Sequence, residues 1–217
     1  MTVRDDEKEE PVLLPVSLLD LIPEDHICHF VAAVVNSMDL RENEDEYRST
    51  AANPAYSRLM LLRLVIMASV DAVWSSREIA KLARENVIYM YLAGNEKPDF
   101  RTISTFKKEC KGLVEAAFKM TVAAAKAVGL ETLGYISMEV PKRKAPAATG
   151  YALSKAEREE IRGIIERGLA IDEKEDRVYG DKRGDELPPE LDTPEKIRRK
   201  IEEYKEAAGE SVKGAAT

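Results

Sequence analysis

Apolar positions recur at helical spacing along most of this chain. The segment that starts at Ile22-Pro23-Glu24-Asp25 combines a first-turn proline and acids with an apolar stripe, which predicts a helix that runs to about Met38. Between Tyr56 and Val73 almost every side of the predicted helix is apolar, and Asn53-Pro54 offers it a start. A helix that is apolar all round is expected inside a core.

Two short helices and a longer one are predicted next. Ser75 stands three residues before Glu78, the spacing at which each side chain can cap the backbone N–H of the other, and an apolar run follows to Leu92. Gly94-Asn95 ends that run, and Lys97-Pro98-Asp99 starts a helix that continues to Val128-Gly129. Gly112 is a candidate point at which this last helix divides in two.

The remaining two fifths of the chain have a different pattern. Residues 133–138 form a strand candidate without a partner strand, and a proline-, alanine- and lysine-rich linker follows. Ser154 and Glu157 repeat the capping pattern before a charged helix, and Thr193-Pro194 starts another beyond an acidic loop, Asp172 to Leu191. The predicted fold is mainly α, with a helix-turn-helix-like element, one orphan strand and a charged helical hairpin. The expected divisions are an acidic disordered tail at 1–12, a helical DNA-binding-like domain at 13–130, the strand and linker at 131–153, the hairpin at 154–208 and a disordered tail at 209–217.

Composition and charge narrow the function classes. The chain has 217 residues, 44% of them hydrophobic, and it lacks an apolar run of the length that crosses a bilayer, so a membrane partner is not expected. Its first residues do not resemble a secretion signal, which predicts a cytoplasmic protein with reduced cysteines. The net charge of −7 is uneven, because residues 53–130 carry 12 Lys and Arg against 7 Asp and Glu. This basic centre warrants a search for a nucleic-acid face.

The strongest local signal lies between Ser75 and Lys111, where a short capped helix precedes a basic one. At 100° per residue, Ser104, Thr105 and Lys108 fall within about 60° of Arg101, with Lys111 near the edge of that face. Such side chains contact phosphates and base edges when a helix enters a major groove. The candidate DNA-binding residues are Arg77, Arg101, Ser104, Thr105, Lys107, Lys108 and Lys111. The alternative is that they are ordinary solvated positions of an amphipathic helix.

Other chemistry has weaker support. His26, Cys28, His29 and Cys110 are possible zinc ligands, but no C-x-x-C pair fixes a second half-site, so a surface histidine pair beside buried thiols is favoured and no metal site is predicted. The sequence has no nucleophile elbow, glycine-rich phosphate loop or HExxH motif.

A series of sequence blocks resembles one known family. Residues 13–26, LLPVSLLDLIPEDH, are similar to the opening of bacterial and archaeal insertion-sequence transposases with the InsH-type N-terminal domain. The blocks that match in order are Asn53-Pro54 to Leu62, Ser75-Ser76-Arg77-Glu78-Ile79, Arg84 to Val87, Tyr91 to Gly94 and Lys97 to Phe106. The resemblance covers about residues 13–139, and the charged region near Tyr179-Gly180 and Arg183 to Pro188 is also similar.

The resemblance implies a helical domain that binds the DNA ends of the element. It also implies a ribonuclease-H-like domain in which an Asp-Asp-Glu triad holds two Mg²⁺ ions for strand cutting and joining. Glu139 stands at the position of the first aspartate of that triad, and the chain ends at Thr217 before the other two acids are expected. We therefore expect a truncated transposase-like protein that binds double-stranded DNA, with no cofactor and without strand transfer.

Three other readings stay open at the level of sequence. The C-terminal helices can form an interaction module that pairs with another copy or with a full-length transposase. Glu139 can be the centre of a residual metal-dependent nuclease. The chain can also be a gene remnant without a function.

Overall fold

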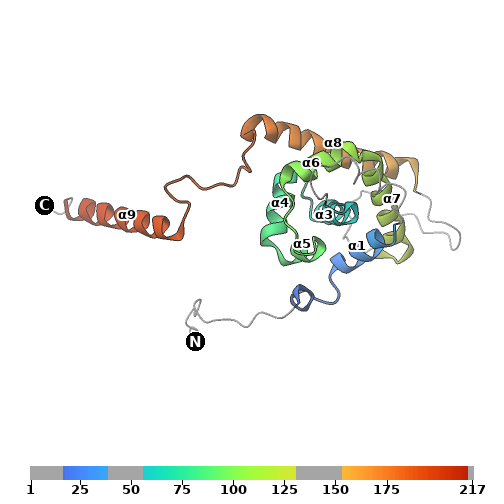
Figure 1. Cartoon of the computed structure of the whole chain (residues 1–217), viewed down its shortest axis with the longest axis horizontal. Helices are drawn as coiled ribbons and strands as arrows, with labels where there is room; N and C mark the ends of the chain where they lie inside the picture. The colour runs from blue at the N-terminus through green and yellow to red at the C-terminus, as the bar shows by residue number, and fades with distance from the viewer. Residues whose placement is uncertain (1–16, 39–55, 131–152, 215–217) are drawn as a thin grey trace. The chain divides into compact units, whose positions relative to one another are not determined.

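The computed structural model describes residues 17–38, 56–130 and 153–214, and these residues are mainly helical and contain no strand (Figure 1). The predicted mainly α fold is confirmed for them. The elements are the 3-10 helix η1 (Leu18–Leu21) and the α-helices α1 (Ile27–Asn36), α3 (Arg58–Val70), α4 (Ser76–Glu85), α5 (Val87–Leu92), α6 (Phe100–Glu109), α7 (Lys111–Ala127), α8 (Lys155–Tyr179) and α9 (Pro194–Gly214). The chain divides into two compact units, residues 1–174 and 175–217.

Helix α3 forms the centre of the first unit, with other helices around it (Figure 1). Eight of its residues are buried, among them Leu61, Leu62, Leu64 and Ala68, each with no measurable exposure. This agrees with the helix predicted to be apolar on every side, and it leaves only Arg58 and Arg63 as charged positions along its length. The Arg63 side chain reaches Asn36 at the end of α1, with 3.0 Å between Nη1 and Oδ1.

Local capping signals place most helix starts where the sequence predicts them. The Ser75 hydroxyl accepts the backbone N–H of Glu78, and the Asp99 carboxylate accepts that of Arg101. Helix α1 differs from the prediction because the chain first turns through Pro23 to Asp25. Its cap is His26, whose Nδ1 accepts the N–H of Cys28 at 3.1 Å. The Asn53-Pro54 start lies outside the described residues.

The long helix predicted after Asp99 is divided in two, as expected, but two residues earlier than Gly112. Cys110 leaves helical geometry with φ −103° and ψ 29° and separates α6 from α7. Gly112 lies inside α7, is exposed and has space around it. Phe106 of α6 and Val114 of α7, on either side of the break at Cys110, are both buried in the core.

Helix α8 extends further than the sequence predicts and joins the core of the first unit. Its stripe residues Ile161 and Ile165 are buried there, and Ser154 and Glu157 form the predicted reciprocal cap, with backbone-to-side-chain distances of 2.7 and 3.3 Å. Residues 172–179, expected to be loop, are helical. The domain divisions and the pairing of α8 with α9 stay predictions, and the strand candidate at 133–138 lies outside the described residues.

The second unit contains the end of α8, a turn and α9. Glu186 accepts the backbone N–H groups of Arg183 and Gly184 at 2.6 and 2.9 Å, and the first of these bonds lowers the pKa of its carboxyl. Gly184 has a φ of 87°, and a Cβ there would meet the Tyr179 ring at 3.3 Å, so this position needs glycine. Thr193 caps α9 by accepting the N–H of Lys196.

Candidate nucleic-acid interface

The basic helix α6 is held by an apolar face and by the neighbouring helix α4. Phe100, Ile103 and Phe106 are buried, as the helical pattern predicts. Arg77 of α4 places its guanidinium carbon 4.1 Å from the centre of the Phe100 ring, a cation–π distance. These contacts fix one side of α6 against the core and thereby orient the opposite side outward.

The outward side of α6 carries three of the predicted DNA-contacting residues. Arg101, Thr105 and Lys108 are exposed, and their spacing of four and three residues places them in one row along the helix. The guanidinium carbon of Arg101 also lies 5.3 Å from the centre of the Phe100 ring, a contact that helps to hold the Arg101 side chain in place. The row therefore presents a guanidinium, a hydroxyl and an ammonium group to the solvent on a rigid element.

Three other predicted DNA-contacting residues are placed inside the fold. Ser104, Lys107 and Arg77 are each buried. Ser104 is 60° and Lys107 is 120° from Arg101 around the helix, and the helices that pack against this side of α6 bury both residues. The three residues therefore lie behind the exposed row, within the packing around α6.

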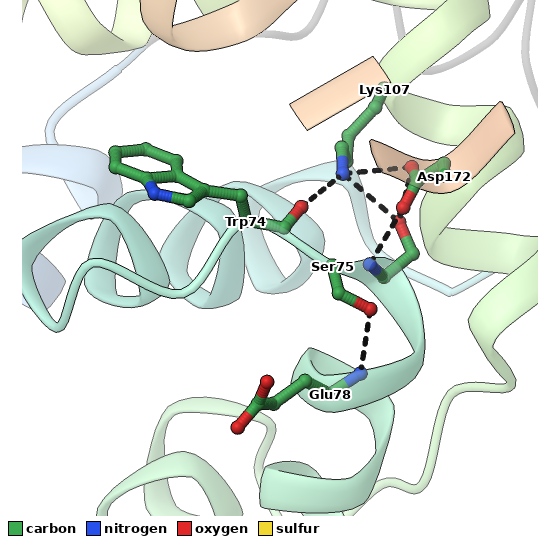
Figure 2. Close-up of polar contacts among 6 residues, drawn as sticks. Trp74, Ser75, Glu78, Lys107 and Asp172 are labelled. Carbon is green, nitrogen blue, oxygen red and sulfur yellow. Dashed lines mark hydrogen bonds and ion pairs between the residues drawn. The ribbon is translucent and has the colours of Figure 1, made fainter. Parts of the chain in front are cut away.

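Lys107 is the centre of a buried polar network that joins three helices (Figure 2). Its Nζ donates to the Trp74 carbonyl at 2.9 Å and to the Ser76 hydroxyl at 3.1 Å, and it lies 2.8 Å from Oδ2 of Asp172. Asp172 in turn accepts the backbone N–H and the hydroxyl of Ser76, both at 2.8 Å. The network satisfies each buried charge and ties α6, the start of α4 and α8 together.

Asp172 is the structural residue that the sequence analysis missed. It acts as a second cap of α4, because its carboxylate receives the first backbone N–H of that helix beside the Ser75 cap (Figure 2). A signal was present in the spacing. Asp172 continues the stripe of Ile161, Ile165 and Gly168 at intervals of four, three and four residues, and an acid on an apolar stripe indicates a buried partner.

A row of ion pairs attaches α8 along α7. From one end to the other, Glu157 pairs with Lys126, Arg162 with Glu115 at 3.1 Å and Glu166 with Lys111 at 3.3 Å. The last pair is largely exposed, so it adds little to stability. It nevertheless places an acid beside Lys111, which the sequence analysis assigned to the edge of the DNA face.

Several pKa values in this region are displaced. Burial opposes ionisation of Glu157, but hydrogen bonds from Lys126 and the backbone N–H of Ser154 outweigh it and lower the pKa of its carboxyl. Hydrogen bonds from Lys119 and Arg162 lower the pKa of Glu115. Burial raises the pKa of the Cys28 and Cys110 thiols, which favours their protonated, unreactive form.

The four possible zinc ligands have other roles or surroundings. His26 caps α1, and the Nε2 of His29 lies 3.0 Å from the carbonyl of Pro23. Within residues 17–38, 56–130 and 153–205, no three His, Cys, Asp or Glu side chains are grouped as metal ligands would be. Glu139 lies outside the described residues. The helices of the described segments also include none that is long and apolar enough to span a membrane.

A protein-family model matches most of the N-terminal half of this chain. Residues 16–109 match the family model described as Transposase domain (DUF772), a range that includes η1, α1 and the helices from α3 to α6. Neither the curated proteins nor the solved structures gave a match. The matched range holds the exposed row of α6 and agrees with the resemblance noted from the sequence blocks. The N-terminal region of this chain is therefore transposase-like, of the kind found in insertion-sequence transposases.

Proposed function

We propose that the first unit binds double-stranded DNA at the ends of an insertion sequence and that α6 enters the major groove. In this proposal α4 and α6 act as a helix-turn-helix-like pair with α5 between them. Arg101 and Lys108 contact phosphates or guanine edges, and Thr105 lies between them on the same face. Arg77, Ser104 and Lys107 hold the helix in position from behind.

The observation that carries this proposal is the exposed row on α6 within the transposase-like region. A helix that enters a groove needs an outward face of donors and an inward face that anchors it to the protein. Helix α6 has both, because its apolar residues are buried against the core while Arg101, Thr105 and Lys108 face solvent. The alternative of an ordinary solvated helix face predicts no preference among DNA sequences.

We further propose that the protein acts in the cytoplasm without strand transfer of its own. Bound at the ends of an element, it would compete with a catalytically active transposase for the same sites. Its DNA affinity would fall as the salt concentration rises, because each phosphate contact releases a counterion.

A salt titration of DNA binding tests the proposal. The full chain is titrated against a labelled duplex that carries the terminal inverted repeat of a related element, and against a scrambled duplex. Arg101→Glu and Lys108→Glu should each weaken binding to the repeat and lower the slope of log affinity against log salt by about one. Lys155→Glu changes the charge equally at an exposed position of α8 and should leave binding nearly unchanged. Equal binding to both duplexes, or equal effects of all three substitutions, would overturn the proposal.

A further inference from the structure

The second unit presents an apolar helix face that the DNA proposal does not use. On α9, Ile197, Ile201 and Tyr204 follow each other at intervals of four and three residues, which places them on one narrow stripe. Ile201 is 49% and Tyr204 is 74% exposed. Two large apolar side chains in solvent on the same helix face indicate an interaction surface.

Charges on α9 are sorted around this stripe. At 100° per residue, Arg198 and Lys205 lie within about 90° of the centre of the stripe on one side, and Lys200 lies about 70° away on the other. The acids Glu195, Glu202 and Glu203 lie on the back of the helix, more than about 120° from the stripe, and Arg199 lies there with them. Arg198, Lys200 and Lys205 therefore occupy the positions that correspond to e and g of a coiled coil. All three are basic.

The basic flanks select the partner. In a pair of identical α9 helices, Lys200 would face Lys205 or its own copy, and like charges at these positions oppose pairing. A second copy of this helix is therefore a poor occupant. A helix that carries acids at its flanking positions would place a carboxylate against each of Arg198, Lys200 and Lys205. Lys200 is already 3.1 Å from Glu203 of its own helix, but both side chains are more than half exposed and can exchange partners.

We infer that α9 is a docking helix for an amphipathic α-helix of another protein whose apolar seam is flanked by acidic residues. The stripe is two positions wide per heptad, which fits a helix–helix seam better than the broad apolar face of a membrane-surface helix. This inference does not rest on the proposed DNA binding, which uses the other unit.

The test uses the full chain and two synthetic coiled-coil peptides of about three heptads, alike except for their flanks. Both carry Ile at a and Leu at d, one has Glu at all e and g positions, and the other has Lys there. Fluorescence anisotropy should show the acidic peptide binding at least about tenfold more tightly than the basic one. The triple variant R198E/K200E/K205E should reverse this preference. Ile201→Asp with Tyr204→Asp should abolish binding of the acidic peptide.

Four outcomes would overturn the inference. These are binding of neither peptide, equal binding of both, self-association of the chain that Ile201→Asp abolishes, and binding of vesicles rich in anionic lipid that the same variant abolishes without any peptide binding. Because the substituted side chains are exposed, thermal unfolding of the chain serves as the control that each variant keeps its fold.

Discussion

The Nζ of Lys107 on α6 and Oδ2 of Asp172 on α8 lie 2.8 Å apart, and the two side chains are only 6% and 2% exposed. A buried ion pair has a net stability close to that of an apolar pair of the same size, but removal of one partner strands the other charge in the interior. Stability therefore depends on the pair as a unit.

Asp172→Ala should lower the free energy of unfolding of the first unit by about 3–5 kcal/mol, because Lys107 and the first N–H of α4 both lose an acceptor. The double variant Lys107→Met with Asp172→Leu should recover only the part of this loss that comes from the unpaired Lys107 charge, because the N–H of Ser76 still lacks an acceptor. Urea unfolding measures both. Glu173→Ala, at the exposed neighbouring position, should stay within about 0.5 kcal/mol of the unchanged protein. If Asp172→Ala lowered the free energy of unfolding by as little as Glu173→Ala, the network would not hold the helices together.

Two glycines of α8 predict different responses to alanine. Gly163 is exposed, and a Cβ there meets nothing within 4 Å, so Gly163→Ala should stabilise the protein by roughly 0.5–1 kcal/mol through helix propensity. At Gly168 a Cβ would lie 3.4 Å from both Lys107 Nζ and the Trp74 carbonyl. Gly168→Ala should therefore stabilise less than Gly163→Ala or destabilise. The midpoint urea concentration of each variant measures its stability. An equal gain at both sites would contradict the close approach of α8 to Lys107 and Trp74.

Acid should weaken the attachment of α8 through Glu157. The pKa of its carboxyl is lower in the folded than in the unfolded chain, so its contribution is present above about pH 4.5 and is lost as the pH falls through the folded pKa. The difference in unfolding free energy between the unchanged protein and Glu157→Gln should thus be largest near neutral pH and shrink below about pH 4. Urea titrations at a series of pH values measure it.

Glu159 provides the comparison for this pH dependence. Its side chain is 62% exposed, and its Oε1 lies 3.8 Å from Nζ of Lys155. Glu159→Gln should change stability little at any pH, because an exposed pair contributes little. The role of Glu157 would be refuted by parallel pH curves for the unchanged protein and Glu157→Gln.

Glu166 should oppose DNA binding if the proposed face is used. Its carboxylate is 3.3 Å from Lys111, where it competes with a phosphate for the ammonium group. Glu166→Gln should raise DNA affinity at low salt several-fold and steepen the salt dependence, since Lys111 gains a phosphate contact. Lys111→Gln should abolish this gain. Unchanged affinity in Glu166→Gln would place Lys111 outside the interface.

The sequence predicts the local part of this fold well, because caps and apolar stripes depend on residues three or four positions apart. Ser154 and Glu157 form their cap as the spacing indicates, and Ile103 and Phe106 face the core. The sequence predicts the division between α6 and α7 at Gly112, two residues after its actual position at Cys110, because glycine is a weaker signal than tertiary packing.

What the sequence does not predict depends on contacts between distant segments. Asp172 continues the apolar stripe of α8, but the stripe does not show which helices it covers, so the buried partner of this acid is not predicted. Ser104 and Lys107 are polar residues typical of a DNA face, and only the docking of α4 and α8 shows that they lie inside. Whether Arg101, Thr105 and Lys108 contact DNA stays a prediction.

The pairing of Lys107 with Asp172 also has a consequence for the order of events during synthesis. Helices α3 to α6 follow one another closely in the sequence, but Asp172, the acid that pairs with Lys107, is synthesised many residues later. Synthesis proceeds at about 5–20 residues per second, so Asp172 follows Lys107 after on the order of several seconds. During this time the Lys107 ammonium group is still solvated. We therefore expect the nascent helices to reach their final rigidity only after α8 has emerged.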